Sequence, residues 1–232
     1  MKLLNTTALA GAAALALLAS AGAASAQDAT VSANIAVTSD YVFRGFSQTN
    51  EDPAIQGGVD ITKGNFYMGI WASNVDFSDS TEAEVDGYGG FRGEVGGFAV
   101  DVGLIGYGYI SSPDDSNYPY IEAKLAVSRA IGPVTAGAAV YYSPDFFGVD
   151  DSATYVEANL AYSPMTNLTV SGAIGEQFLD VSDDYVTWNV GATYAFAGTP
   201  LALDVRYSDT DVDTPSIPIS DGRVLATLKA TF

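Results

Sequence analysis

The sequence predicts an all-β protein, a twelve-stranded antiparallel transmembrane β-barrel with up-and-down strand order, preceded by a cleaved signal peptide. Three observations lead to this prediction. Apolar and polar residues alternate over segments of about ten residues. The connections between these segments are alternately short and long, and the acidic residues collect in the long ones. Outer-membrane barrels combine short periplasmic turns with longer external loops in the same way.

The first 26 residues have the organisation of a secretory signal peptide. Lys2 precedes a stretch rich in alanine and leucine, and Ala24, Ser25 and Ala26 provide a small-residue cleavage site. We therefore expect removal of residues 1–26, with residues 27–232 forming the barrel domain. A retained N-terminal membrane helix is the alternative, which the short apolar stretch disfavours.

The composition argues against several classes of function. A formal net charge of −19 disfavours nucleic acid as a partner. Histidine and cysteine are absent, so the commonest general base and the commonest transition-metal ligands are missing. Residues 209–214 (DTDVDT) start like a calcium loop but lack its glycine at the sixth position. We therefore predict no catalytic residue, no metal site and no cofactor.

Twelve segments show the alternation that is typical of strands. They are residues 31–46, 53–62, 65–75, 85–95, 98–110, 120–129, 134–143, 153–162, 167–176, 185–196, 200–208 and 222–232. The long connections are residues 47–52, 76–84, 111–119, 144–152, 177–184 and 209–221. They hold 18 of the 28 acidic residues and no lysine or arginine. Strict alternation places them all at one end, which we expect to be external, and we expect 209–221 to fold inward.

The last segment, 222–232, shows most clearly which residues would face lipid and which the lumen. Val224, Leu228 and Phe232 share one face, whereas Arg223 and Lys229 share the other. In the first segment, the same parity places Val37, Tyr41 and Phe43 toward lipid. The predicted pore lining consists of Asp40, Arg44, Asp60, Arg92, Glu94, Asp101, Glu122, Lys124, Glu157, Asp204, Arg206, Arg223 and Lys229.

Neighbouring charges on one strand suggest how the lumen is neutralised. Residues two apart on a strand share a face, so ion pairs are expected for Arg92–Glu94, Glu122–Lys124 and Asp204–Arg206, with Asp40–Arg44 as a fourth. Such pairs permit two readings, which the sequence leaves open. They either fill a narrow barrel or form a pore lining that sets ion preference.

Aromatic residues indicate two membrane interfaces. Phe66, Phe98, Tyr162, Tyr194, Phe196 and Phe232 lie beside short turns or at the C-terminus, and Tyr41, Phe43, Tyr142 and Tyr207 lie nearer the long loops. The expected partners are outer-membrane lipid and lipopolysaccharide, together with the barrel-assembly machinery through the C-terminal Phe232.

The segment SDYVFRGFSQTNEDPAIQGGVD, residues 39–60, resembles the Gcw_chp family of proteobacterial outer-membrane proteins, also called TorF-type candidate porins. Its members are similar in an opening strand with the pattern S-x-Y-x-x-R-G-x-S, then a proline and a glycine-rich second strand. The matching positions are Ser39, Tyr41, Arg44, Gly45, Ser47, Pro53, Gly57 and Gly58. The resemblance implies a location in the Gram-negative outer membrane and a pore function, without naming a substrate.

The sequence therefore favours a porin that lets small solutes or ions diffuse passively through a narrow lumen. The acidic external rim predicts a weak preference for cations. Two alternatives remain at this point: a nonconducting barrel that is structural or presents its loops to a partner, and a barrel hydrolase that uses lumen carboxylates.

Overall fold

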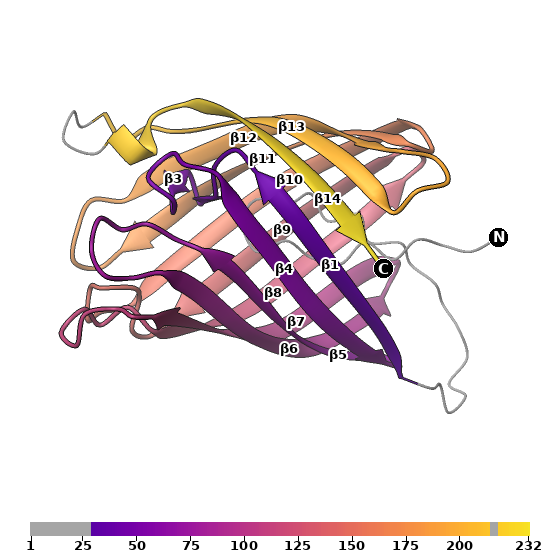
Figure 1. The fold of residues 1–232 in the computed structure, drawn as a ribbon. Coiled ribbons are helices and arrows are strands. Elements are labelled where there is room, and N and C mark those ends of the chain that lie inside the picture. Colours follow the sequence, from indigo (N-terminus) through magenta and orange to yellow (C-terminus); the bar gives the residue numbers. More distant parts are fainter. Residues whose placement is uncertain (1–28, 214–217) are drawn as a thin grey trace.

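A computed structural model describes residues 29–213 and 218–232, so the expected signal peptide lies outside the described residues. Twelve antiparallel strands form a closed barrel (Figure 1). Each strand pairs with its neighbours in the chain, and β1 pairs with β14 to close the ring. The predicted fold class and up-and-down order are confirmed.

The barrel strands match the predicted segments closely, with one exception. They are β1 (Thr30–Thr38), β4 (Ala54–Lys63), β5 (Phe66–Asn74), β6 (Ala83–Val95), β7 (Phe98–Ile110), β8 (Tyr120–Ile131), β9 (Val134–Ser143), β10 (Ala153–Met165), β11 (Leu168–Leu179), β12 (Tyr185–Ala195), β13 (Leu201–Thr210) and β14 (Arg223–Thr231). The exception is the first strand, which we predicted to continue to residue 46.

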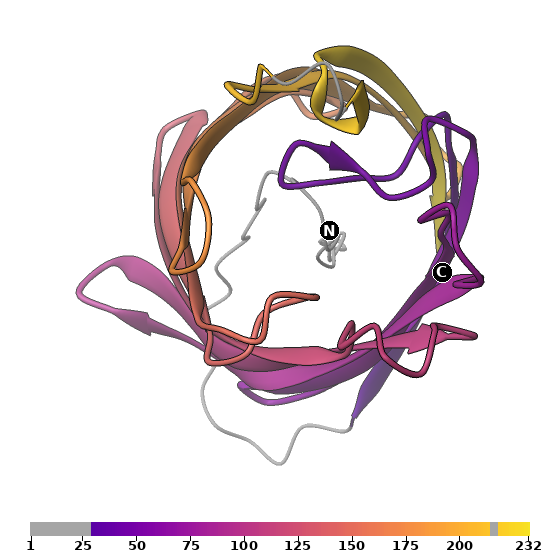
Figure 2. The same cartoon turned by 90° about the vertical axis from the view of Figure 1, so that its left-hand side faces the viewer.

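After Thr38 the chain leaves the wall and turns into the barrel. Strands β2 (Val42–Phe43) and β3 (Phe46–Ser47) pair only with each other, and Figure 2 shows this hairpin inside the ring. Phe43 pairs with Phe46, so Arg44 and Gly45 form a two-residue turn. Both have positive φ, 47° and 89°, as the favoured type I′ turn requires. We call residues 39–53 the inner hairpin.

Apolar side chains cover the outside of the barrel, as a bilayer requires. In β8, for example, Glu122 and Lys124 are buried inside whereas Ile121 and Leu125 are exposed outside. The predicted aromatic residues near the short turns are all exposed, as are Tyr142 and Tyr207 near the long loops. Within residues 29–213 and 218–232, no helix has the length and apolarity to cross a membrane.

Tyr41 and Phe43 do not face lipid, so that part of the prediction is wrong. The Tyr41 side chain is buried, and its ring packs against Trp71 with 5.3 Å between centroids. The Phe43 ring packs against Tyr107 at 6.0 Å. Both aromatic residues belong to the inner hairpin and attach it to the inside of the wall.

Candidate functional site

Most of the predicted pore-lining residues lie inside the barrel, either on the inner face of its wall or in the inner hairpin. Asp40, Asp60, Asp101, Glu122, Lys124, Arg44 and Arg206 are buried there, and Arg92, Glu157, Asp204, Arg223 and Lys229 are half-buried. Glu94 differs, since it is exposed near the end of β6. Glu84 and Asp86, which the sequence analysis did not include, are also buried inside. Their alternation with the exposed Val85 was the available signal.

Arg44 reaches from the tip of the inner hairpin to the opposite wall. Its Nη1 and Nη2 donate to the two carboxylate oxygens of Glu122 on β8, both at 2.8 Å. Nη1 also donates to Oε1 of Gln177 on β11 at 3.0 Å. Three strands separate β1 from β11, and three separate β4 from β8, so this contact bridges the barrel.

The environment of Arg44 strongly favours its charged form. Burial alone would lower the pKa of the guanidinium, but the charge of Glu122 and its hydrogen bonds, together with the neighbouring Tyr107 and Tyr120, raise that pKa above its ordinary value. Glu122 is 1% exposed and Gln177 is 0% exposed, so solvent does not screen the interaction. The inner hairpin is therefore held across the bore by a fixed, buried ion pair.

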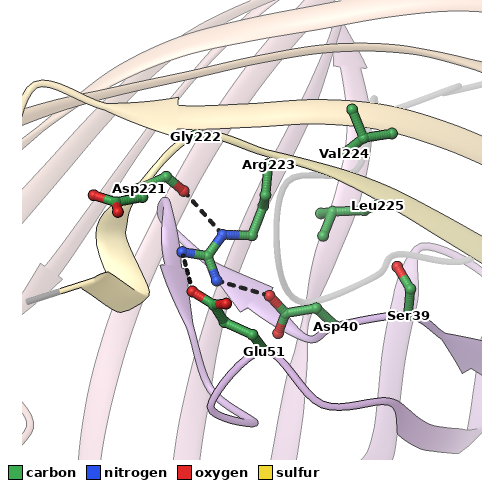
Figure 3. A pocket seen from close by; sticks show the side chains of 8 residues that line it. All are labelled: Ser39, Asp40, Glu51, Asp221, Gly222, Arg223, Val224 and Leu225. Atoms are coloured by element: carbon green, nitrogen blue, oxygen red, sulfur yellow. Dashed lines mark hydrogen bonds and ion pairs between the residues drawn. The ribbon is translucent and has the colours of Figure 1, made fainter.

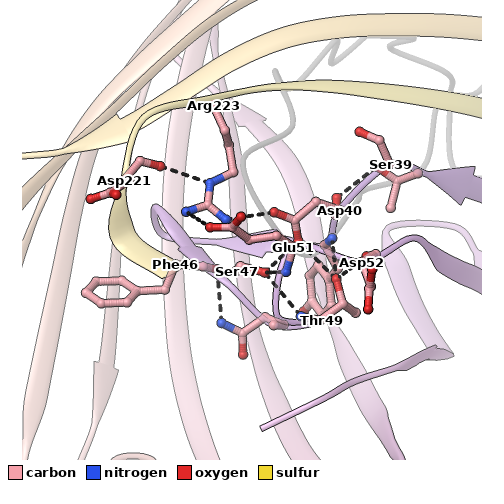
Figure 4. Close-up of polar contacts among 12 residues, drawn as sticks. Ser39, Asp40, Phe46, Ser47, Thr49, Glu51, Asp52, Asp221 and Arg223 are labelled. Atoms are coloured by element: carbon pink, nitrogen blue, oxygen red, sulfur yellow. Dashed lines mark hydrogen bonds and ion pairs between the residues drawn. The ribbon is translucent and has the colours of Figure 1, made fainter. Parts of the chain in front are cut away.

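The base of the inner hairpin is tied to the last strand. Arg223 Nη1 donates to Asp40 Oδ2 at 3.0 Å, and Arg223 Nη2 lies 3.3 Å from Glu51 (Figure 4). Ser47 and Thr49 donate their hydroxyl groups to the other oxygen of Asp40. Asp40 thus connects both arms of the inner hairpin to β14.

A cavity of about 450 Å³ lies beside this base, between the inner hairpin and β14 (Figure 3). Its lining is mostly polar and includes Asp40, Glu51, Asp221 and Arg223. The pairing of β1 with β14 stops at Thr38 and Thr227, below this level. The cavity therefore lies where the wall pairing between β1 and β14 has ended.

A second charged cluster centres on Asp101 of β7. Its carboxylate accepts from Lys124 Nζ at 2.9 Å, Arg92 Nε at 3.1 Å and the Tyr67 hydroxyl at 2.7 Å. Asp101 is 0% exposed. The guanidinium of Arg92 also lies 3.9 Å from the centroid of the Tyr67 ring. This cluster crosslinks the four adjacent strands β5, β6, β7 and β8 from within.

Most ion pairs join residues on different strands or segments and not two residues on one strand. Among the four predicted pairs, Asp204–Arg206 is present, with 3.1 Å between Oδ2 and Nη2. The other three are wrong, because Arg92 and Lys124 bind Asp101, Arg44 binds Glu122, and Asp40 binds Arg223. In each case the partner comes from a different strand or from the inner hairpin.

Four interior carboxylates have no lysine or arginine partner among the ion pairs of the described residues: Asp60, Glu84, Asp86 and Glu157. Tyrosine hydroxyls donate to three of them, Tyr88 to Asp60 at 2.7 Å, Tyr41 to Glu84 at 3.0 Å and Tyr155 to Glu157 at 3.3 Å. A hydroxyl satisfies an oxygen without cancelling its charge. By number, the interior therefore holds more carboxylates than lysine and arginine side chains.

In the long loop 209–221, which we expected to fold inward, the described residues meet the inner hairpin. Its residues 214–217 lie outside the described residues. The short 3₁₀ helix η1 (Pro218–Ser220) contacts β3, and the Thr210 hydroxyl donates to the Ser220 carbonyl oxygen. This loop supports the inner hairpin from the β13 side. No group of three or more potential metal-ligating residues occurs in the described ranges.

Gly45 gives the first testable prediction about this site. Its φ of 89° disfavours other residues, and an added Cβ would strike Thr210 and lie 2.9 Å from Thr187 Oγ1. We expect Gly45→Ala to displace the tip of the inner hairpin and to lower the free energy of unfolding by more than about 1–2 kcal/mol. Urea unfolding, monitored by tryptophan fluorescence, measures the change.

Gly87 provides the matched control for this substitution. It lies in β6 with nothing within 4 Å of an added Cβ, and its φ is not positive. Gly87→Ala should therefore leave stability unchanged or slightly raised. Equal effects of the two substitutions would contradict a tightly seated hairpin tip.

Solved structures share this barrel architecture. The KdgM porin superposes with a TM-score of 0.61 at 10% identity, covering 87% of this chain and 99% of that one. The KdgM porin in complex with disordered oligogalacturonate gives 0.58 at 9% identity, covering 88% and 99%. At these identities, the likeness establishes the fold of an outer-membrane β-barrel.

A third structure is a porin refined at 1.8 Å resolution, with a TM-score of 0.43 and 17% identity. The match covers 77% of this chain, which spans 62% of the length of that porin. No curated protein sequence matches the chain.

The sequence itself identifies the family. The profile described as "Bacterial protein of unknown function (Gcw_chp)" matches residues 20–232, which include the whole barrel, the inner hairpin and the motif around Arg44. The chain therefore belongs to the Gcw_chp family.

Proposed function

We propose that the barrel is a passive outer-membrane channel for small polar solutes or ions, with a weak preference for cations. One observation carries the proposal. The closed barrel is apolar outside, while its interior holds the eight carboxylates Asp40, Asp60, Glu84, Asp86, Asp101, Glu122, Glu157 and Asp204 against the six cations Arg44, Arg92, Lys124, Arg206, Arg223 and Lys229. A polar path through a membrane in which carboxylates outnumber cationic side chains favours positive ions.

The charged groups of the interior also indicate which class of solute would pass through the barrel. The KdgM structure contains oligogalacturonate, a polyanion, in its complex. Four interior carboxylates of the present chain have no cationic partner among the described ion pairs, which disfavours a polyanionic solute. Small cations and uncharged polar solutes fit this interior better.

Single-channel recording in a planar bilayer tests the proposal. With a salt gradient across the refolded barrel, we expect discrete conductance steps and a reversal potential of cation-selective sign. A reversal potential of anion-selective sign would overturn the cation preference. Folded barrels that never conduct would overturn the channel itself.

Two variants separate interior charge from rim charge. Glu157→Gln removes a half-buried interior carboxylate, whereas Asp115→Asn removes an exposed loop carboxylate. At 1 M salt the Debye length is about 3 Å, so rim charges are screened more than interior ones. We expect Glu157→Gln to shift the reversal potential toward anions at 1 M salt and Asp115→Asn to leave it unchanged. The opposite ranking would assign selectivity to the loops.

A nonconducting barrel is the second candidate, and the inner hairpin favours it. Tyr155, Glu122 and Gln177 around the Arg44 guanidinium are at most 5% exposed, so this part of the bore is filled by side chains. In that case the unmodified protein would give no steps, whereas a variant without the Arg44 contact would conduct.

A further inference from the structure

The wall opposite β1 carries a pocket whose shape and charge suit a planar cation. We call it the wall pocket, formed by Glu122, Tyr141, Tyr155 and Gln177. These residues come from β8, β9, β10 and β11, four adjacent strands of the barrel. Tyr107 donates its hydroxyl to Glu122 Oε2 at 3.0 Å, so the carboxylate is oriented from its own wall. The pocket is thus built on rigid strands.

Each part of the wall pocket matches a feature of a guanidinium group. Glu122 accepts two parallel N–H bonds, the bidentate geometry that guanidinium forms with a carboxylate. Gln177 accepts a further N–H through its amide oxygen. The guanidinium carbon lies 4.4 Å from the Tyr155 ring centroid and 5.1 Å from that of Tyr141. Ring faces and a bidentate carboxylate together select guanidinium over an ammonium group.

In this structure the wall pocket is occupied by the Arg44 side chain of the inner hairpin. Apart from the Phe43 ring, the groups in contact with the Arg44 guanidinium belong to the wall, so the wall supplies all the polar partners of the pocket. Because Arg44 is tethered, a free solute with the same head group must exceed the effective concentration of the Arg44 side chain to displace it.

We propose that the wall pocket is a binding site for guanidinium-bearing solutes, which displace Arg44 and so release the tip of the inner hairpin from the opposite wall. The proposed binding of the solute depends only on the wall pocket. The link from displacement to conduction rests on the proposed channel function. The solute class is therefore narrowed from small cations to those with a guanidinium head.

Binding is tested with Arg44→Ala and methylguanidinium chloride as the probe. The variant protein is refolded in detergent, and its unfolding temperature is followed over the millimolar range of the probe. We expect a saturable rise, because the probe restores the counterion of Glu122. Urea, which has nearly the same shape without the charge, and sodium chloride should give no saturable rise.

Two further proteins test whether the stabilisation by methylguanidinium is specific to the wall pocket. Arg44→Ala combined with Glu122→Gln lacks the carboxylate and should lose the saturable rise. Wild-type protein, whose pocket already holds Arg44, should show a much weaker rise. A variant that refolds only with methylguanidinium present would also support the site. No guanidinium-specific stabilisation of Arg44→Ala, or an equal effect in the double variant, would overturn it.

Opening is tested separately on wild-type protein in a planar bilayer. Methylguanidinium added on the side of the long loops should increase the open probability more than an equal concentration of sodium ions. Stabilisation of Arg44→Ala without any effect on wild-type currents would retain the binding site and overturn the release of the hairpin. Absence of all currents, including those of Arg44→Ala, would instead contradict the proposed channel function.

Discussion

Replacement of Arg44 by alanine is expected to raise the single-channel conductance of the refolded barrel several-fold. The substitution removes the only side chain of the inner hairpin that forms an ion pair with the opposite wall among the described residues. The hairpin keeps the ring contacts of Phe43 with β7 and of Phe46 with β12, but its tip loses the contact with β8 and β11 and the bore loses a large side chain. Glu122 then remains buried without a counterion, and the free energy of unfolding should fall by about 3–5 kcal/mol. Bilayer recording and urea unfolding measure the two effects.

Arg129→Ala is the control for the change of charge. Arg129 is exposed on the outer face near a short turn, with its guanidinium 5.2 Å from the Phe98 ring centroid. Its removal alters the net charge equally but leaves the bore unchanged. An Arg44→Ala conductance equal to that of Arg129→Ala would show that the inner hairpin does not limit flow.

Replacement of Asp101 by asparagine should cause the largest loss of stability among the interior carboxylates. The change leaves Lys124, 8% exposed, without its carboxylate partner and weakens the contact of Arg92. Breaking a buried pair from one side costs about 3–5 kcal/mol. Urea unfolding of the refolded barrel measures this cost.

Asp204→Asn is the matched comparison, because Asp204 is half-buried and has one cationic partner. That partner, Arg206, keeps its hydrogen bonds to Asn189 and Ser171. The loss should therefore be smaller than for Asp101→Asn. An equal loss for both would mean that the cluster around Asp101 is no more strongly coupled than an ordinary pair.

The barrel was predictable from the sequence because its two environments select different residues at alternate positions. Outward residues such as Ile121 and Leu125 meet lipid, while Glu122 and Lys124 between them meet the interior. The inner hairpin was not predicted, because burial against protein selects the same residue types as burial against lipid. Tyr41 and Phe43 keep the alternation of β1 although they pack on Trp71 and Tyr107. The Arg44–Gly45 turn was the one local signal.

The ion pairs needed information that alternation does not contain, namely the register between strands. For Arg92 and Asp101 this information was present: the two-residue turn at Gly96 and Gly97 places them opposite each other. No local rule relates Arg44 to Glu122, which is 78 residues away in the chain. That contact follows from the closure of the whole ring.

The position of the inner hairpin in the chain constrains the order in which the barrel is assembled. The hairpin forms part of the first segment synthesised after the expected signal peptide, yet Gln177 is 133 residues away from Arg44, and Arg223 is 183 residues away from Asp40. Contacts of such separation form late, because a long loop must close first. Docking of the hairpin thus waits for β11, and its tie to β14 waits for the last strand. A barrel that has reached its full stability is one whose bore has already been bridged.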